Sequence, residues 1–266
     1  MIDSNTLPLL RHPLDQPSAF TPEQLMDSVR GLRGLPSQPV PALCILEFDG
    51  DLTDWLVQQN LVHEEPHWAC FHTRMYTAEL AGLRTGIIPR TIGGPYAVLI
   101  AEQLATAGVR LIVGLTSAGR VSPALPLPCL LIADRAVRDE GASLHYLPPS
   151  ESVACPIPDF LPLLARELPA AGRAVHTGPV WTTDAPYRET TAQLQHWSAE
   201  NILAVEMQAA SLFAFAHARK SPAAVVAMVS NAVDHPGEQF DTGTPDFGLR
   251  VLEAIARAAR EWLNPA

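Results

Sequence analysis

Short apolar runs alternate with longer helix-like stretches along the 266 residues of this chain. The runs are rich in β-branched side chains, which is typical of strands buried on both faces. They cover residues 42–48, 85–88, 109–113, 129–132, 174–177 and 223–229. Helices are predicted from residue 22, over 96–106, 156–166 and 206–216, and from a Thr244 cap to about Trp262. This alternation predicts an α/β fold with three α-β-α layers and a mostly parallel, mixed central sheet flanked by helices.

The first 38 residues differ from the rest of the chain. Thr21 can cap a helix, Pro22 suits its first position, and Gln24 can complete a capping box. The residues that end this helix are Gly31, Gly34 and Pro36. We expect residues 1–38 to form an N-terminal arm and helix, and residues 39–266 to form one domain.

Small polar residues gather where the predicted strands end. They are Asp49-Gly50-Asp51, Thr116-Ser117-Ala118-Gly119, the loop from Trp181 to Asp184, and Ser230-Asn231. Open α/β sheets bind ligands beyond the carboxyl ends of their strands, so these residues indicate a site there.

Glu206, Met207 and Gln208 open a helix that is apolar on every side. Such a helix is buried, and polar groups at its start need partners. Two interpretations remain open for Glu206: a carboxylate favoured by the helix dipole, or part of a ligand-binding shelf.

Composition narrows the possible partners. A formal net charge of −10 argues against a nucleic-acid backbone as the main partner. We see no membrane-spanning apolar run and no signal peptide, and therefore expect a cytoplasmic protein. The four cysteines are widely spaced, which predicts reduced thiols and no metal site; they are Cys44, Cys70, Cys129 and Cys155.

Six motifs occur in a characteristic order: GGPYAVLIAEQLATAG, TSAG, RDEGASLHYLP, TTDAPYRET, AVEMQAAS and MVSNAV. This set resembles the nucleoside phosphorylase and nucleosidase superfamily, which includes uridine phosphorylase, purine nucleoside phosphorylase and methylthioadenosine nucleosidase. The resemblance spans roughly residues 42–262, and GASLHY is closest to the uridine phosphorylase version. It implies a nucleoside phosphorylase-like catalytic domain over residues 39–266, which cleaves the N-glycosidic bond of a nucleoside and assembles into homodimers or hexamers.

The resemblance places the nucleophile end of the site at Gly50 and at the TSAG motif. Thr116, Ser117 and Gly119 supply hydroxyls and backbone N–H groups in an expected strand-to-helix turn, which suits an anion. Family phosphorylases carry an arginine in a Gly-Asp-Pro-x-Arg loop and another before the Gly-Ser/Thr turn. Here the loop reads Gly-Asp-Leu-Thr-Asp over residues 50–54, and the second position is Gly114.

Without those arginines, phosphate capture needs another guanidinium group nearby. The candidates are Arg74, Arg90 and Arg120, with Arg74 also able to act across a subunit interface as the resemblance implies. The alternative for each is a solvated surface charge.

At the base end, the family places an aspartate in a Val-Ser-Asp pattern, whereas this chain has Ser230 and Asn231. Asparagine cannot donate a proton at neutral pH, but its amide can both donate and accept hydrogen bonds to a 6-oxo base. The Gln-x-Arg pair that reads uracil aligns with Thr190 and Ala192, which argues against uracil specificity.

The loop before that pair carries further candidates for base contacts. They are Trp181, Thr183, Asp184, Tyr187 and Arg188. Aromatic and guanidinium groups can stack on a base or line its edge, although Trp and Tyr are also ordinary packing residues.

At the sugar end, the resemblance assigns Met207 to pack on the ribose, with Glu206 beside it. The next residue is usually a glutamate that accepts hydrogen bonds from the sugar hydroxyls, and here it is Gln208. An amide keeps a hydrogen bond to a hydroxyl but lacks the negative charge that faces the oxocarbenium-like state.

The sequence therefore predicts a pentosyltransferase of the nucleoside phosphorylase type, acting on a purine-like or modified nucleoside in purine salvage. Phosphate is the expected acceptor and co-substrate, with no other cofactor. Gln208 and Asn231 are the expected catalytic residues. Two alternatives remain: a nucleosidase that uses water, and a nucleoside-binding protein with little catalysis.

Overall fold

The structure, a computed structural model, describes residues 7–233 and 243–264. Its centre is a large mixed β-sheet. The described strands are β1 (Leu43–Glu47), β2 (His63–Glu64), β3 (Tyr76–Leu80), β4 (Leu83–Pro89), β5 (Leu111–Arg120), β6 (Cys129–Asp139), β7 (Ser152–Ala154), β8 (Ala174–Thr183), β9 (Ala204–Glu206) and β10 (Ala223–Ala232).

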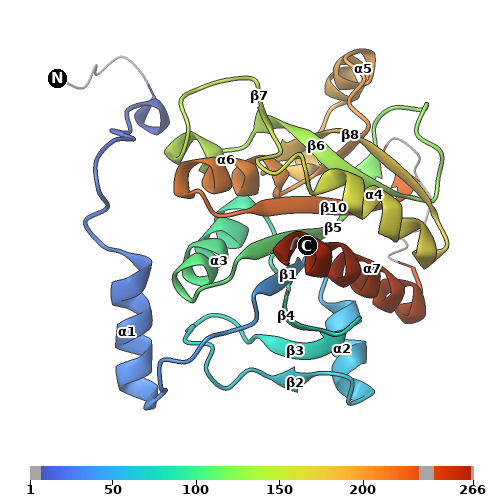
Figure 1. The fold of residues 1–266 in the computed structure, drawn as a ribbon. Coiled ribbons are helices and arrows are strands. Elements are labelled where there is room, and N and C mark those ends of the chain that lie inside the picture. The colour runs from blue at the N-terminus through green and yellow to red at the C-terminus, as the bar shows by residue number, and fades with distance from the viewer. Residues whose placement is uncertain (1–6, 234–242, 265–266) are drawn as a thin grey trace.

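Helices cover both faces of this sheet. The described α-helices are α1 (Pro22–Arg33), α2 (Asp51–Gln58), α3 (Gly94–Thr106), α4 (Leu161–Glu167), α5 (Thr191–Ala199), α6 (Ala209–Arg219) and α7 (Pro245–Leu263). Short 3₁₀ helices are η1 (Pro8–Leu10), η2 (Ala142–His145), η3 (Leu168–Ala171) and η4 (Pro186–Arg188). Figure 1 shows α3 and α6 on one side and α2, α4 and α7 on the other. The expected α/β fold with a mixed, helix-flanked sheet is confirmed.

The strand order brings separate parts of the chain to one edge. β1 is parallel to β4 and β5, and β5 is parallel to β10. The pairings of β5 with β10, β10 with β6, β6 with β8, β8 with β9, and β9 with β5 complete a closed ring. Strand ends that are distant in sequence therefore meet around this ring.

Five strands, β4, β5, β6, β8 and β10, are longer than their apolar runs predict. β5 includes the whole TSAG motif, β6 extends to Asp139, β8 includes Trp181, and β10 includes Asn231. The prediction of a turn at TSAG and of a loop from Trp181 was wrong, because pairing within the ring overrides the local turn preference of Gly, Ser and Thr. For example, β10 pairs with β5 as far as Ala232 and Arg120.

The prediction that Glu206 opens a helix was also wrong. Glu206 ends strand β9, and α6 begins at Ala209 with Gln208 as its N-cap residue. The short strand forms because Ala204 and Val205 pair with both β8 and β5. α6 itself is a core helix, as predicted, since every residue from Ala209 to Ala216 is buried.

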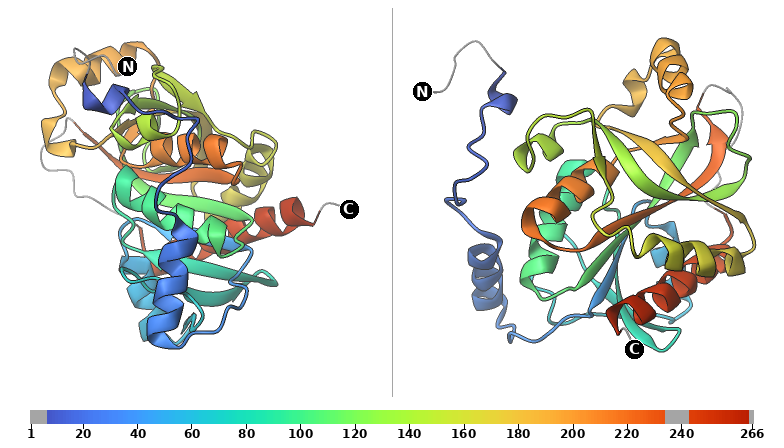
Figure 2. Two further views of the ribbon diagram at one scale, coloured as in Figure 1. Left: turned by 90° about the vertical axis from the view of Figure 1, so that its left-hand side faces the viewer. Right: turned by 45° about the horizontal axis from the view of Figure 1, so that its top comes forward.

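The N-terminal helix has the predicted capping box. The Thr21 hydroxyl accepts from the Gln24 amide at 3.4 Å, and the Thr21 amide donates to Gln24 Oε1 at 3.0 Å. Gly31 lies inside α1, and Gly34 ends it in a left-handed conformation. Figures 1 and 2 show α1 and the arm before it running along one side of the main body.

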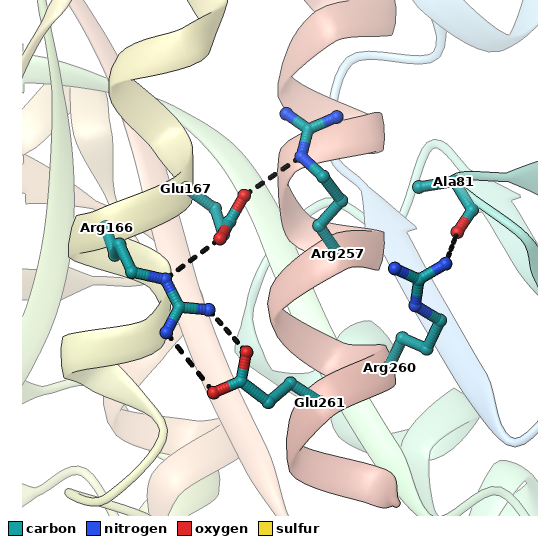
Figure 3. Close-up of polar contacts among 6 residues, drawn as sticks. All are labelled: Ala81, Arg166, Glu167, Arg257, Arg260 and Glu261. Atoms are coloured by element: carbon teal, nitrogen blue, oxygen red, sulfur yellow. Dashed lines mark hydrogen bonds and ion pairs between the residues drawn. The ribbon is translucent and has the colours of Figure 1, made fainter.

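Polar contacts fasten the last helix to its neighbours (Figure 3). Glu167 of α4 accepts from Arg166 and from Arg257 of α7, both at 3.0 Å. Arg166 also binds Glu261. Within the described parts of the chain, no helix has the length and hydropathy needed to cross a membrane.

Candidate functional site

The carboxyl ends of β4, β1, β5 and β10 lie side by side. Glu47 of β1 is in register with Pro89 of β4 and with Leu115 of β5, and Thr116 is in register with Ala227 of β10. The residues that follow on each strand therefore share one edge of the sheet, which is where an α/β sheet binds its ligand.

A buried carboxylate shapes the first loop at this edge. Glu47 is 3% exposed, and its carboxylate accepts from the Gly50 amide at 2.7 Å and from the Thr53 hydroxyl at 2.6 Å. Burial raises the pKa of Glu47, against the opposing effect of these hydrogen bonds. Gly50 has a positive φ of 92°, which a glycine adopts without strain.

Asp49 connects this loop to β5. The Ser117 hydroxyl donates to Asp49 Oδ1 at 3.2 Å. Burial, and then the neighbouring charges of Glu47 and Asp51, raise the pKa of Asp49 to about 6. The sequence analysis placed Asp49 among the small polar residues at the end of a buried strand but assigned it no role in the site.

Arg90 lies over Gly50. A Cβ atom on Gly50 would come within 2.6 Å of Arg90 Cγ and 3.0 Å of its Cζ. The guanidinium also forms an ion pair with Asp54. The structure thus brings the predicted residues Gly50, Arg90 and Ser117 to one edge, with acidic residues among them.

The other residues predicted to contact phosphate have other partners in the structure. The Arg74 side chain is 69% exposed and pairs with Glu64 at 3.2 Å. Thr116 is fully buried, and its hydroxyl donates to the Ser117 carbonyl. A Cβ atom on Gly119 would come within 2.4 Å of Val233, so this glycine permits close packing between strands. Among the hydrogen bonds of the described residues, the Ser117 hydroxyl is the group of the TSAG motif that binds the acidic first loop, which covers residues 49–54.

Glu206 supports the start of α6. Its carboxylate accepts from the amides of Gln208 at 2.7 Å and Ala209 at 2.9 Å, and from the Thr182 hydroxyl at 2.5 Å. Burial raises the pKa of Glu206 to about 7, while these three hydrogen bonds act in the opposite direction. This geometry favours the helix-dipole interpretation, because the carboxylate is occupied by the helix terminus.

Gln208 is fully buried, whereas its neighbour Met207 is half-buried. Among the described residues, neither Oε1 nor Nε2 of Gln208 has a hydrogen-bond partner. Leaving a buried amide unpaired costs on the order of 1–3 kcal/mol, so a ligand hydroxyl at this position would be stabilised. Gln208 has the most direct structural support of the predicted ribose contacts.

Glu140 lies beside the start of α6 and was missed by sequence reasoning. Its Oε2 accepts from the Ser211 hydroxyl at 2.5 Å and from the Ser143 amide at 2.9 Å. Within the described chain, Glu140 Oε1 and the buried Thr91 hydroxyl have no hydrogen-bond partner. Glu140 is part of the RDEGASLHYLP motif, but nothing in that motif indicates contact with α6.

Close packing joins these groups to the Gly-Gly-Pro turn before α3. A Cβ atom on Gly94 would lie 2.1 Å from Ser211 Oγ and 3.6 Å from Glu140 Oε2. The structure therefore needs a glycine here, and it places buried, unpartnered polar atoms close to the starts of both α3 and α6.

At the base end, Trp181 has the packing role, which was the alternative to stacking on a base. Trp181 is fully buried, packs on Trp197 with ring centroids 6.1 Å apart, and donates from Nε1 to Asp139 at 3.0 Å. Its position on β8 points it into a small core cluster. Tyr187 is the opposite case, because it is 99% exposed and extends into solvent.

The remaining predicted base contacts are on strand ends and in the loop after β8. Asn231 is in register with Gly119, and the Ser230 hydroxyl donates to Asn231 Oδ1 at 3.4 Å. Asp184 accepts from the Gly141 amide at 2.8 Å, and burial raises the pKa of Asp184. Thr183 is buried, and its hydroxyl accepts from the Ala185 amide.

Two proteins named as phosphorylases are similar to this chain in sequence. Guanosine phosphorylase from Halorubrum lacusprofundi is 29% identical over 199 residues, which cover 72% of this chain and 79% of that protein. Uridine phosphorylase from Escherichia coli is 26% identical over 199 residues, which cover 68% of this chain and 78% of that protein.

A solved structure of uridine phosphorylase from Vibrio fischeri superposes with a TM-score of 0.69. It covers 85% of this chain and 95% of that protein at 20% identity, so it shows a shared fold. The family model described as the phosphorylase superfamily matches residues 42–264. Because this match extends over most of the chain and agrees with the order of the motifs, the chain belongs to the phosphorylase superfamily.

Proposed function

We propose that this protein cleaves the N-glycosidic bond of a nucleoside that carries a purine-like or modified base, and transfers the ribosyl group to phosphate. The observation that carries the proposal is the fully buried Gln208, whose side-chain amide has no hydrogen-bond partner among the described residues. A ribose hydroxyl that both donates and accepts hydrogen bonds would satisfy this amide. The relatives named guanosine and uridine phosphorylase support the reaction class.

Arg90 and Ser117 support phosphate as the acceptor. Arg90 lies over Gly50, so a guanidinium group is present at the first loop although the family arginine is missing. Ser117 supplies a hydroxyl from the adjacent strand. In the reaction, a phosphate oxygen forms a bond to C1′ while the bond from C1′ to the base nitrogen breaks. Positioning the two reactants together is the main task of these groups.

Asn231 supports a base with a carbonyl edge. It lies on β10 opposite Gly119, and its amide can donate to a 6-oxo group and accept from a neighbouring N–H. The positions of the uracil-reading pair are Thr190 and Ala192, and Thr190 serves instead as the N-cap of α5. The guanosine phosphorylase relative supports the same choice of base and a role in purine salvage.

Hydrolysis is the second candidate, and the acidic first loop favours it. Arg90 is paired with Asp54, and Asp49 stands beside Glu47 and Asp51. These carboxylates repel a phosphate dianion, whereas an ionised Asp49 can accept a proton from water. The pKa of Asp49, about 6, leaves it mostly ionised at neutral pH.

A product assay distinguishes these functions. Purified protein is incubated with guanosine, inosine, adenosine and uridine, with and without phosphate, and free base and ribose 1-phosphate are quantified. We expect base release from a 6-oxopurine nucleoside that depends on phosphate and yields equal amounts of both products. Equal base release without phosphate would contradict phosphorolysis and support hydrolysis. Tight binding without any turnover would indicate a nucleoside-binding protein.

A further inference from the structure

The N-terminal segment forms one side of a partly open cavity on the rest of the molecule. The cavity has a volume of about 370 Å³, and its walls come from the arm, α1, α3, η2 and the end of α6. The arm and α1 precede residue 42, where the match to the family begins, so half of this cavity is built by residues outside the family region. Figures 1 and 2 show the segment running beside α3.

We propose that this cavity is a second small-molecule site, which binds an uncharged, planar heteroaromatic molecule of about nucleobase size. Its volume lies within the range of roughly 300–1,000 Å³ that is usual for ligand pockets. Its lining does not include Asp49, Arg90, Gln208 or Asn231, so it is separate from the nucleoside site.

The apolar walls suit a flat ring. Phe20 from the arm is 63% exposed and Leu99 from α3 is 41% exposed, and both line the cavity together with Leu25 of α1. These two large apolar side chains are exposed to water in the open cavity, and they lose part of that contact when an apolar ring enters. Phe20 adds an aromatic face on which a planar ligand can stack.

The charges in the cavity cancel, which favours an uncharged ligand. Glu102 accepts from Arg219 Nε and from the Tyr146 hydroxyl, both at 2.9 Å. His145 is neutral at pH 7, because partial burial and then the neighbouring His12 lower its pKa below the usual value. A charged ligand would therefore lose its hydration in the cavity without gaining an unpaired opposite charge, which disfavours its binding.

One wall carries a polar atom that needs a partner. Gln103 is 1% exposed, and its Nε2 donates to the Leu99 carbonyl at 3.2 Å. Within the described residues, Gln103 Oε1 accepts no hydrogen bond. An N–H group at the edge of a heteroaromatic ring would supply the missing donor, as an apolar hydrocarbon would not.

Contacts on both sides hold the walls in place before a ligand arrives. The His12 and His145 rings are in contact, tilted by 38° with centroids 3.9 Å apart, and the Thr106 hydroxyl donates to Glu23 of α1 at 3.0 Å. A preformed pocket loses less conformational entropy on binding than one that must be assembled.

The test measures how many ligand molecules the full-length protein binds. Radiolabelled hypoxanthine is the probe in equilibrium dialysis, with wild type, Leu99→Trp and Leu32→Trp. The indole in Leu99→Trp fills the cavity, whereas Leu32 is 77% exposed on α1 and does not line it. We expect Leu99→Trp to bind one molecule fewer per chain than wild type and Leu32→Trp. Equal stoichiometry in Leu99→Trp and Leu32→Trp would overturn the proposal.

Gln103→Leu provides a second test that leaves the volume of the side chain nearly unchanged. We expect about tenfold weaker binding at the cavity, since one hydrogen bond to the ligand is lost. Unchanged affinity would overturn the role of Gln103 Oε1. The result is independent of the proposed function: without a working nucleoside site, wild type binds one molecule and Leu99→Trp binds none.

Discussion

Glu206 and Gln208 are two positions apart, and the fold gives them different environments. The Glu206 carboxylate accepts three hydrogen bonds, from the backbone N–H groups of Gln208 and Ala209 and from the Thr182 hydroxyl. The side-chain amide of Gln208 forms no hydrogen bond within the described residues. Glu206 therefore positions the start of the helix, and we propose that the side chain of Gln208 contacts a ligand. A carboxylate at position 208 would be buried near Glu206 and Glu140, whose charges would raise its pKa.

The first prediction concerns Gln208→Glu. A carboxylate facing the oxocarbenium-like state should raise kcat by a factor on the order of 100 to 1,000, equivalent to roughly 3–4 kcal/mol. Because burial keeps part of the new carboxyl group protonated at neutral pH, the gain should be larger at pH 9 than at pH 6. Steady-state kinetics across this range with the best nucleoside measures it. No gain at any pH would mean that Gln208 serves a different specificity.

The second prediction concerns Asp49, whose pKa is about 6. Its charge is present above that pH and lost below it. If phosphate binds beside it, the KM for phosphate should rise as the pH increases from 5 to 8, and Asp49→Asn should flatten this rise. The hydrolytic alternative predicts a different effect of Asp49→Asn. If Asp49 is the general base, phosphate-independent base release should fall by about 100- to 10,000-fold in this variant.

A third prediction links Glu206 to stability. Its pKa in the folded protein is about 7, above the ordinary 4.5, so the folded state binds more protons between these values. Its contribution to stability is fully present below pH 4.5 and is lost as the pH rises through 7. The free energy of unfolding in urea should therefore decrease between pH 5 and pH 8 by roughly 2–3 kcal/mol less in Glu206→Gln than in wild type. An identical pH dependence in both proteins would contradict this role.

At the scale of elements, the contact between α3 and α6 sets the geometry around the proposed sugar end. Gly94 at the start of α3 approaches Ser211 of α6 so closely that a Cβ atom would overlap its hydroxyl. Ser211 in turn donates to Glu140. This approach brings the Gly-Gly-Pro turn, η2 and α6 together, and a change at the contact should affect all three.

The fourth prediction tests this contact with two glycines. Gly94→Ala should destabilise the fold by about 1–3 kcal/mol and lower turnover, because the added methyl group displaces Ser211. Gly31→Ala is the matched control, since nothing lies within 4 Å of its Cβ position in α1. It should be neutral or stabilise by up to about 1 kcal/mol. Urea midpoints measure both, and equal effects would show that α3 can shift without cost.

At the scale of the whole molecule, two segments that are joined by a hydrogen bond each carry an exposed apolar side chain. Ile92 is 52% exposed and Phe71 is 44% exposed. The two segments that carry them meet where the Tyr96 hydroxyl donates to the His72 carbonyl. Arg74 is exposed in the same region. Such a surface suits contact with a second copy that receives Arg74 at its own phosphate position.

The fifth prediction is therefore an oligomer, either a homodimer or a hexamer built from dimers. Size-exclusion chromatography with light scattering should report at least twice the chain mass of 28.7 kDa. Ile92→Asp should dissociate the assembly, because it places a charge within the contact, whereas Leu32→Asp on α1 should not. A monomeric wild-type protein at tens of micromolar would contradict the proposal.

Local features of the sequence determined much of this fold. The alternation of apolar runs and helical stretches predicted the α/β class, and capping residues predicted the starts of α1 and α7. These features depend on neighbours within a few positions, so they can be interpreted without tertiary contacts. The order of the motifs also identified the family correctly.

Long-range pairing decided the rest. The extra length of β5 and β10 and the burial of Trp181 follow from strands that close a ring across the chain. The position of Arg90 over Gly50 follows from the pairing of β1 with β4, whose ends place the two residues side by side. The end of β9 and the start of α6 separate Glu206 from Gln208 for the same reason. The sequence by itself determined which elements form and which family they build. Only the tertiary structure decided which polar groups are already satisfied and which remain for a ligand, because that depends on partners distant in sequence.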